Sequence, residues 1–182
     1  MLNDDDLKYI ESAAVEMARH AGGILLEYFK GPLQIDYKSP NNRDPVTDAD
    51  HASDEYLRKE ISARFPSHGI VTEEATSAEQ TVTNIVWVID PLDGTSNFLN
   101  GLPLFGVLIA VLEDGQPVVS AIFLPDIHKP EGRVLHARRG GGAFDEDIPL
   151  GNTDNPKGER SMSAWPSYFL RMYTYKKVLR RR

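Results

Sequence analysis

The stretch IVWVIDPLDGTSNF, residues 85–98, joins an apolar run to a polar turn. Its first five residues are β-branched or aromatic, which is typical of a central strand buried on both faces. Asp90 and Asp93 follow this run, and Gly94 and Thr95 come next. The stretch therefore predicts a strand over residues 85–89 that brings two carboxylates to one edge of a sheet.

Two amphipathic helices are expected before this strand. Apolar residues recur at helical steps of three and four over residues 4–29, and Asn3 or Asp4 can cap the start of that helix. A second helix is expected to begin after Thr47, a good N-cap, and to end at Phe65-Pro66. Both helices have an apolar face that must be buried against another layer.

Short apolar runs predict further strands at residues 70–72, 104–112, 117–124 and 133–137. The two middle runs are joined by EDGQ, whose Asp-Gly pair is a strong hairpin signal. Two helices followed by at least four strands predict an α+β fold, with layered helices packed on a largely antiparallel sheet. One last helix is expected near residues 168–182.

Composition narrows the classes of partner. The 182 residues fit one domain, and the formal net charge of -7 disfavours a general nucleic-acid or anionic-membrane binder. The basic residues Lys176, Lys177 and Arg180 to Arg182 fit the charged face of a helix better than a nucleic-acid patch. The acidic N-terminus is unlike a secretory signal, and no run of about 18 apolar residues occurs. We therefore expect a cytoplasmic protein.

The acidic residues suggest a metal site. Asp90 and Asp93 would repel each other unless they were protonated or a cation neutralised them. The chain has no cysteine, so a hard cation such as Mg²⁺ is favoured. Gly94 permits close backbone approach, and the Thr95-Ser96-Asn97 segment is typical of a helix start that could hold a phosphate. From DPLDGT alone, an ordinary capped turn is an equally good interpretation.

Two more acidic clusters precede the strand, namely Glu73-Glu74 and the set Asp44, Asp48 and Asp50. Taken singly, each is typical of a solvated surface. In order, however, DPVTDAD (44–50), FPSHGIVTEE (65–74) and WVIDPLDGTSNFLNGLPLFGVLIAV (87–111) resemble the inositol monophosphatase family. The resemblance continues through LEDGQPVVSAIFLP (112–125) and RVLHARRGGGAF (133–144), and so covers about residues 5–150.

The resemblance implies a fold, an activity and a set of site residues. The fold would be the N-terminal part of an αβαβα sugar phosphatase. The activity would be Mg²⁺-dependent hydrolysis of a phosphate monoester, first of all inositol monophosphate, although similar relatives act on histidinol phosphate, fructose bisphosphate or adenosine bisphosphates. The implied metal ligands are Glu73, Asp90, Asp93 and the main-chain carbonyl of Leu92. The implied substrate-binding residues are Asp93, Gly94, Thr95 and Lys38, and the implied catalytic residues are Glu73, Thr95 and Asp50. A homodimer is also implied.

Family members also carry a Gly-Ser-Ala segment and a Trp-Asp-x-Ala-Ala-Gly motif, whose aspartate completes a second metal site. Neither occurs in residues 1–182. We therefore expect a single, incomplete domain that lacks the C-terminal substrate-reading portion. The second metal should then bind weakly, and uncovered strands should favour association. A non-catalytic remnant that binds metal or a partner protein is the alternative function.

Overall fold

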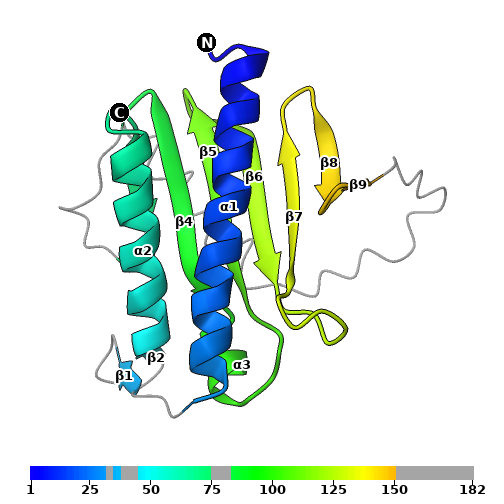
Figure 1. The fold of residues 1–182 in the computed structure, drawn as a ribbon. Coiled ribbons are helices and arrows are strands. Elements are labelled where there is room, and N and C mark those ends of the chain that lie inside the picture. Colours follow the sequence, from blue (N-terminus) through cyan, green and yellow to red (C-terminus); the bar gives the residue numbers. More distant parts are fainter. Residues whose placement is uncertain (32–34, 38–44, 75–82, 151–182) are drawn as a thin grey trace, which may run out of the picture. The chain divides into compact units, whose positions relative to one another are not determined.

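Helices α1 (Asp4–Phe29) and α2 (Asp48–Arg64) lie side by side across a sheet in the computed structural model (Figure 1). The structure describes residues 1–31, 35–37, 45–74 and 83–150. In these ranges the sheet has the strand order β3-β4-β5-β6-β7-β8-β9. Its strands are β3 (Gly69–Thr72), β4 (Ile85–Asp93), β5 (Gly106–Glu113), β6 (Gln116–Leu124), β7 (Arg133–Arg138), β8 (Gly142–Asp145) and β9 (Ile148–Pro149).

Only β3 and β4 pair in parallel, and every other neighbouring pair in this sheet is antiparallel. The predicted α+β class, with helices layered on a largely antiparallel sheet, is confirmed. The short strands β1 (Ile35–Tyr37) and β2 (Pro45–Thr47) form a separate two-stranded ladder. Helix α3 (Thr95–Leu99) follows β4.

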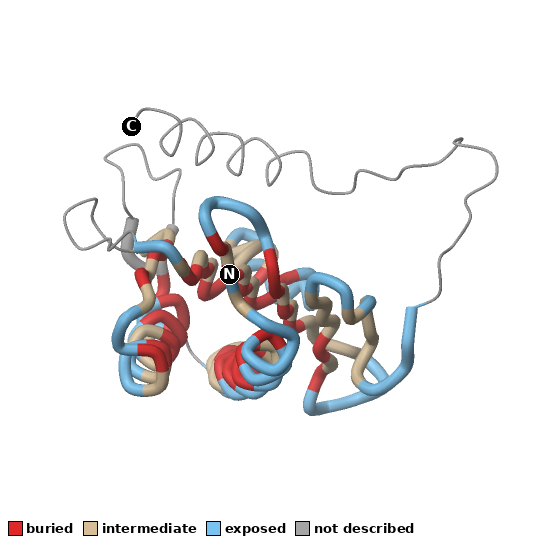
Figure 2. The backbone as a smooth tube through the Cα atoms, turned by 90° about the horizontal axis from the view of Figure 1, so that it is seen from above, coloured by how far each residue is buried: buried red, intermediate tan, exposed pale blue. Residues whose placement is uncertain are grey.

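Both long helices cover the same face of the sheet, as Figure 2 shows. The helix-facing core includes Trp87, Ile109, Val111, Ala121 and Phe123, each at most 2% exposed. Helix α1 approaches the sheet closely at Gly22, where an added Cβ would lie 2.2 Å from the Phe123 ring. A larger residue there would push α1 away from β6, so the glycine allows the two layers to pack tightly.

Both predicted helix starts are confirmed. Asn3 caps α1 in a capping box with Asp6, and Thr47 caps α2 in a capping box with Asp50. Each box gives partners to N–H groups that have none within the helix. The predicted EDGQ hairpin also forms: Asp114 and Gly115 both have positive φ values, 49° and 75°, as a two-residue type I′ turn requires.

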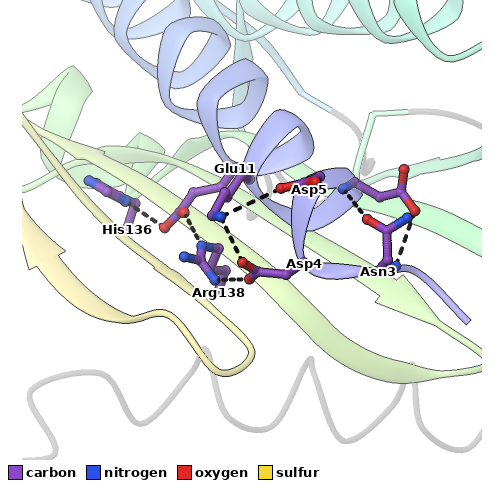
Figure 3. A network of polar contacts seen from close by, with 8 residues as sticks. Asn3, Asp4, Asp5, Glu11, His136 and Arg138 are labelled. Carbon is purple, nitrogen blue, oxygen red and sulfur yellow. Dashed lines mark hydrogen bonds and ion pairs between the residues drawn. The ribbon is translucent and has the colours of Figure 1, made fainter.

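A polar network ties the N-terminal half of α1 to β7 (Figure 3). The Glu11 carboxylate lies 2.8 Å from Nδ1 of His136 and 3.0 Å from Nε of Arg138. Nη1 of Arg138 also donates to Asp4 at 2.6 Å. The contacts join residues far apart in sequence, and so fix where the first turns of α1 lie along the sheet.

Two predicted strand boundaries differ from the structure by two residues or more, and the others by at most one. Strand β5 begins at Gly106 rather than Leu104, whose side chain is 57% exposed. Strand β4 extends beyond Ile89 to Asp93, because Asp90 and Asp93 both pair with β5 across a register shift. The helix expected near residues 168–182 and the basic residues in it lie outside the described residues. In the described part, no helix is both long and apolar enough to span a membrane.

Candidate active site

The end of β4 holds the two central acids. Asp90 pairs with Leu108, and Asp93 pairs with Gly106, with an irregular register between them. Pro91 and Leu92, which fill this irregularity, are buried, whereas both aspartates are half-buried. A bulge of this kind re-aims side chains at the end of a strand. It therefore keeps Asp90 and Asp93 within the sheet while giving both of them access to solvent.

The parallel neighbour β3 brings Glu73 to the same edge. Thr72 is paired with Ile89, and the next amide, that of Glu73, donates to the Ile89 carbonyl at 3.3 Å. The C-terminal ends of parallel neighbours lie at one edge of a sheet. Glu73, just after β3, and Asp90, near the end of β4, therefore lie at the same edge of the sheet, and both residues are half-buried.

Thr95 connects the turn after β4 to α2. Its hydroxyl donates to the Leu92 carbonyl at 3.1 Å and lies 3.4 Å from Oδ1 of Asp50. Asp50 is 2% exposed, and its Oδ2 accepts from the amide of Thr47 at 2.8 Å and from the Thr47 hydroxyl at 2.6 Å. The structure thus brings together three residues that the sequence named for the site.

Gly94 makes this turn possible. Its φ is +82°, and an added Cβ would lie 2.7 Å from the Leu104 carbonyl oxygen. The same oxygen accepts from Nδ2 of Asn97 at 2.8 Å. Glycine therefore meets two requirements here, a left-handed backbone and a close approach to the segment that precedes β5.

The electrostatics of the site disfavour ionised aspartates. Burial raises the pKa of Asp90 to about 7, with a further contribution from the negative charge of Asp93. Burial also raises the pKa of Asp93 to about 6, although the backbone N–H of Gly94 acts in the opposite direction. A cation beside these carboxylates would favour their charged forms.

Three polar residues behind the acids were missed in the sequence. The Ser53 hydroxyl donates to the Pro91 carbonyl at 2.8 Å, and the Thr72 hydroxyl donates to Oδ1 of Asp54 at 2.6 Å. Ser53, Asp54 and Thr72 are all buried. Ser53 and Asp54 lie on the buried face of α2, which also carries Ala49, Leu57 and Ile61. Polar residues on an otherwise buried helix face were the signal available for finding them.

The donor set fits a hard cation. Carboxylates of Glu73, Asp90 and Asp93 and the Leu92 carbonyl are oxygen donors, and Mg²⁺ commonly combines one or two carboxylates with water and substrate phosphate. Within the described ranges, no three or more His, Cys, Asp or Glu side chains are gathered closely enough to hold a metal ion. The acids thus share one edge of the sheet without forming a complete cage of side chains. Lys38 and Asp44 lie outside the described residues.

The sequence and the fold together define a class of protein in which two helices cover one face of a sheet and acidic side chains lie at one edge of it. Residues 6–168 match the model of the inositol monophosphatase family. The chain therefore belongs to that family, which is a family of phosphomonoesterases.

Two curated relatives show the level of similarity. The chain is 37% identical over 137 residues to a histidinol-phosphatase of Chlorobaculum parvum, covering 75% of this chain and 51% of the relative. It is 38% identical over 118 residues to an inositol-1-monophosphatase of Mesorhizobium japonicum, covering 65% and 42%. The chain thus spans about half the length of the curated relatives it matches.

Solved structures show the same fold. The extragenic suppressor protein SuhB of Bartonella henselae matches with a TM-score of 0.69 and 30% identity, over 78% of this chain and 54% of that protein. An IMPase/NADP phosphatase solved with Mg²⁺ and phosphate matches with a TM-score of 0.68 and 24% identity, over 79% and 53%. The second likeness supports the fold alone.

Proposed function

We propose that this chain carries the metal- and phosphate-binding part of a Mg²⁺-dependent phosphomonoesterase. Its substrate would be a small sugar or polyol phosphate, with inositol 1-phosphate the first to test. The observation that carries the proposal is the pair Asp90 and Asp93, whose pKa values are raised by burial at the end of β4. Glu73 leaves the neighbouring parallel strand at the same edge.

Glu73, Asp90, Asp93 and the Leu92 carbonyl would hold Mg²⁺. When bound, Mg²⁺ would neutralise charge on the phosphoryl oxygens and lower the pKa of a nearby water molecule. The negative charges at this edge would otherwise repel a phosphate, so the acids and the substrate both require a cation. Gly94 and Thr95 would contact the phosphate, together with Asp93 and Lys38.

The residues of the chain would orient the attacking water. The Thr95 hydroxyl has one hydrogen, which can be donated to the Leu92 carbonyl or to Asp50. Its oxygen is then able to accept a hydrogen from water. Asp50 is held by two contacts from Thr47 and so gives Thr95 a fixed partner. Glu73 would take the proton from the water as it attacks phosphorus.

A second candidate is a non-catalytic protein that binds a metal ion or a partner. The observation that favours it is that the described side chains do not gather three potential metal ligands, so the described residues alone do not form a complete catalytic metal site. Under either function we expect a homodimer, which sedimentation velocity can measure. Other phosphate monoesters, including histidinol phosphate, fructose bisphosphate and adenosine bisphosphate, are alternative substrates.

The test is phosphate release across a Mg²⁺ titration. Substrates are inositol 1-phosphate, histidinol phosphate, fructose 1,6-bisphosphate and adenosine 3′,5′-bisphosphate. Asp93→Asn should abolish release, whereas Asp147→Asn, which changes an exposed acid in the turn between β8 and β9, should not. Release from no substrate at saturating Mg²⁺ would reject catalysis, and Mg²⁺ binding without release would support the second candidate.

A further inference from the structure

Two acidic segments, Glu73-Glu74 and Asp90 to Asp93, lie at the site. Helix α2 contacts the chain in or beside each of them through two consecutive residues. Ser53, which is fully buried, donates to the Pro91 carbonyl at 2.8 Å. Asp54, which is 7% exposed, accepts from the Thr72 hydroxyl at 2.6 Å. Pro91 lies between Asp90 and Asp93, and Thr72 immediately precedes Glu73. One helix therefore contacts the chain beside each proposed group of metal ligands.

The Ser53 contact fixes a particular peptide plane. The carbonyl that accepts from Ser53 belongs to the Pro91–Leu92 peptide, and the N–H of that same peptide, on Leu92, favours the charged form of Asp90 and so lowers its pKa. A peptide unit is planar, so holding its oxygen also sets the direction of its N–H. Ser53 thus orients the N–H group that acts on Asp90, although no hydrogen bond joins Ser53 to the acid itself.

The Asp54 contact acts on the neighbouring strand. The Thr72 hydroxyl donates to Asp54, and the amide of Glu74 donates to the Thr72 hydroxyl at 3.3 Å. Nη1 of Arg58, one helical turn further on, lies 3.8 Å from Oδ2 of Asp54. The bend that contains Glu73 and Glu74 is therefore linked to α2 through Thr72.

We infer that Ser53 and Asp54 are positioning residues, which hold the Glu73–Glu74 bend and the Asp90–Asp93 segment in fixed places relative to each other and so support the binding of a divalent cation beside them. This inference rests on the proposed function. The acids of the two segments repel each other when they are ionised, so an external support is needed to keep the segments in place. A helix is a rigid support, and contacts from adjacent residues on it fix both turns relative to each other.

Four variants of the full chain test the inference. Ser53→Ala and Asp54→Ala each remove one contact, and Asp54→Asn keeps an oxygen that can accept from Thr72. Thr83→Val is the matched control, because Thr83 lies at the opposite ends of the same two strands. Its hydroxyl donates to the Ile85 carbonyl at 2.7 Å and accepts from the Gly69 amide at 2.8 Å.

The first measurement is amide hydrogen exchange without metal. Ser53→Ala should speed exchange at Leu92 and Asp93, and Asp54→Ala should speed exchange at Glu73 and Glu74. We expect about fivefold in each case, the factor that corresponds to one ordinary hydrogen bond. The second measurement is Mg²⁺ affinity by calorimetry, which each alanine variant should weaken about 10-fold. Thr83→Val should change neither quantity at these turns, and Asp54→Asn should match the unmodified chain.

The inference is overturned if the alanine variants shift exchange and affinity no more than Thr83→Val does. It is also overturned if Asp54→Asn weakens Mg²⁺ as much as Asp54→Ala, since charge rather than position would then be responsible. If the unmodified chain binds no Mg²⁺, the proposed function fails, and the exchange measurement alone decides whether α2 holds the turns. Should Asp54→Ala not fold, Thr72→Val removes the same contact, and Glu73 exchange and Mg²⁺ affinity are measured on it instead.

Discussion

The hydroxyl of Thr95 lies 3.4 Å from Oδ1 of Asp50, across 45 residues of sequence. The contact joins the turn after β4 to the first turn of α2. It also gives the hydroxyl a second acceptor besides the Leu92 carbonyl, at 3.1 Å. A hydroxyl held between two acceptors has a restricted direction, and under the proposed function that direction decides where an attacking water lies.

Replacing Thr95 with valine removes the hydroxyl that would orient the water while keeping the β-branched shape of the side chain. Under the proposed function, we expect phosphate release to fall about 100-fold, the lower end of what a positioned proton-transfer group contributes. Thr95→Ser keeps the hydroxyl and should retain most of the activity. Initial rates with inositol 1-phosphate at saturating Mg²⁺ measure both. Equal rates for the valine and serine variants would show that the hydroxyl has no role in the reaction.

Asp90→Asn should stabilise the metal-free protein. The pKa of Asp90 is raised by burial, and then by the charge of Asp93, to about 7. The folded state therefore opposes ionisation of Asp90. The resulting loss of folding stability begins as the pH rises above the pKa of the unfolded state, near 3.8, and it is fully present above about pH 7. At pH 8, asparagine should increase the unfolding free energy by about 1 to 3 kcal/mol.

Urea unfolding at pH 8, with and without Mg²⁺, measures this effect. Saturating Mg²⁺ should stabilise the unmodified chain and should stabilise Asp90→Asn much less, because a ligand of the ion is lost. Asp147→Asn serves as the control for loss of an exposed charge. A metal-free Asp90→Asn protein less stable than the unmodified chain would contradict the assignment of Asp90 as an acid whose ionised form destabilises the fold.

His68 should make stability depend on pH. The indole N–H of Trp87 donates to Nδ1 of His68 at 3.0 Å, and burial lowers the pKa of His68 below its usual 6.5. The native state therefore resists protonation. The stabilising contribution is fully present above about pH 6.5 and is lost as the pH falls through the lower, native pKa.

His68→Gln keeps an oxygen that can accept from Trp87 but does not titrate. Urea unfolding of both proteins between pH 5 and 8 isolates the contribution of His68, because other acids titrate equally in both. The unmodified chain should lose stability relative to His68→Gln as the pH decreases below about 6.5. A constant difference over this range would show that the histidine ionises as freely in the native state as when unfolded.

Short sequence patterns correctly predicted those elements of the fold that depend on neighbouring residues alone. The apolar residues 85–89, the Asp-Gly turn at 114–115 and the caps Asn3 and Thr47 all behave as expected. The extension of β4 was missed, because polar Asp90 and Asp93 remain in the strand only through pairing with β5. Strands β8 and β9 were also missed, since two to four residues give little periodic signal.

The residues of the candidate site were likewise predictable only where their signal lies in the neighbouring sequence. Asp90 and Asp93 were recognisable from their position after an apolar run, whereas the meeting of Asp50 with Thr95 came only from the resemblance to a family. Ser53 and Asp54 were missed because each contacts a residue distant in sequence, and which turn lies beneath a helix depends on tertiary packing. Polar residues on the buried face of α2 were visible, but their partners were not.

Gly94→Ala should reduce both stability and activity. Gly101→Ala is the control that separates the effect of the positive φ from the effect of the crowded space around the added methyl group. Both glycines have positive φ values, +82° and +70°, but a Cβ at Gly94 would lie 2.7 Å from the Leu104 carbonyl oxygen, whereas nothing lies within 4 Å at Gly101. Gly101→Ala should therefore cost only the backbone strain, about 1 kcal/mol.

Gly94→Ala should cost about 1 to 3 kcal/mol more, because the added methyl group must displace backbone. That displacement moves the Thr95 turn, so Mg²⁺-dependent phosphate release should fall much further than in Gly101→Ala under matched folded conditions. Urea unfolding and initial rates measure the two effects separately. Equal losses of stability in both variants would mean that the Leu104 segment yields to the methyl group, and the turn would then owe its form to the backbone angle alone.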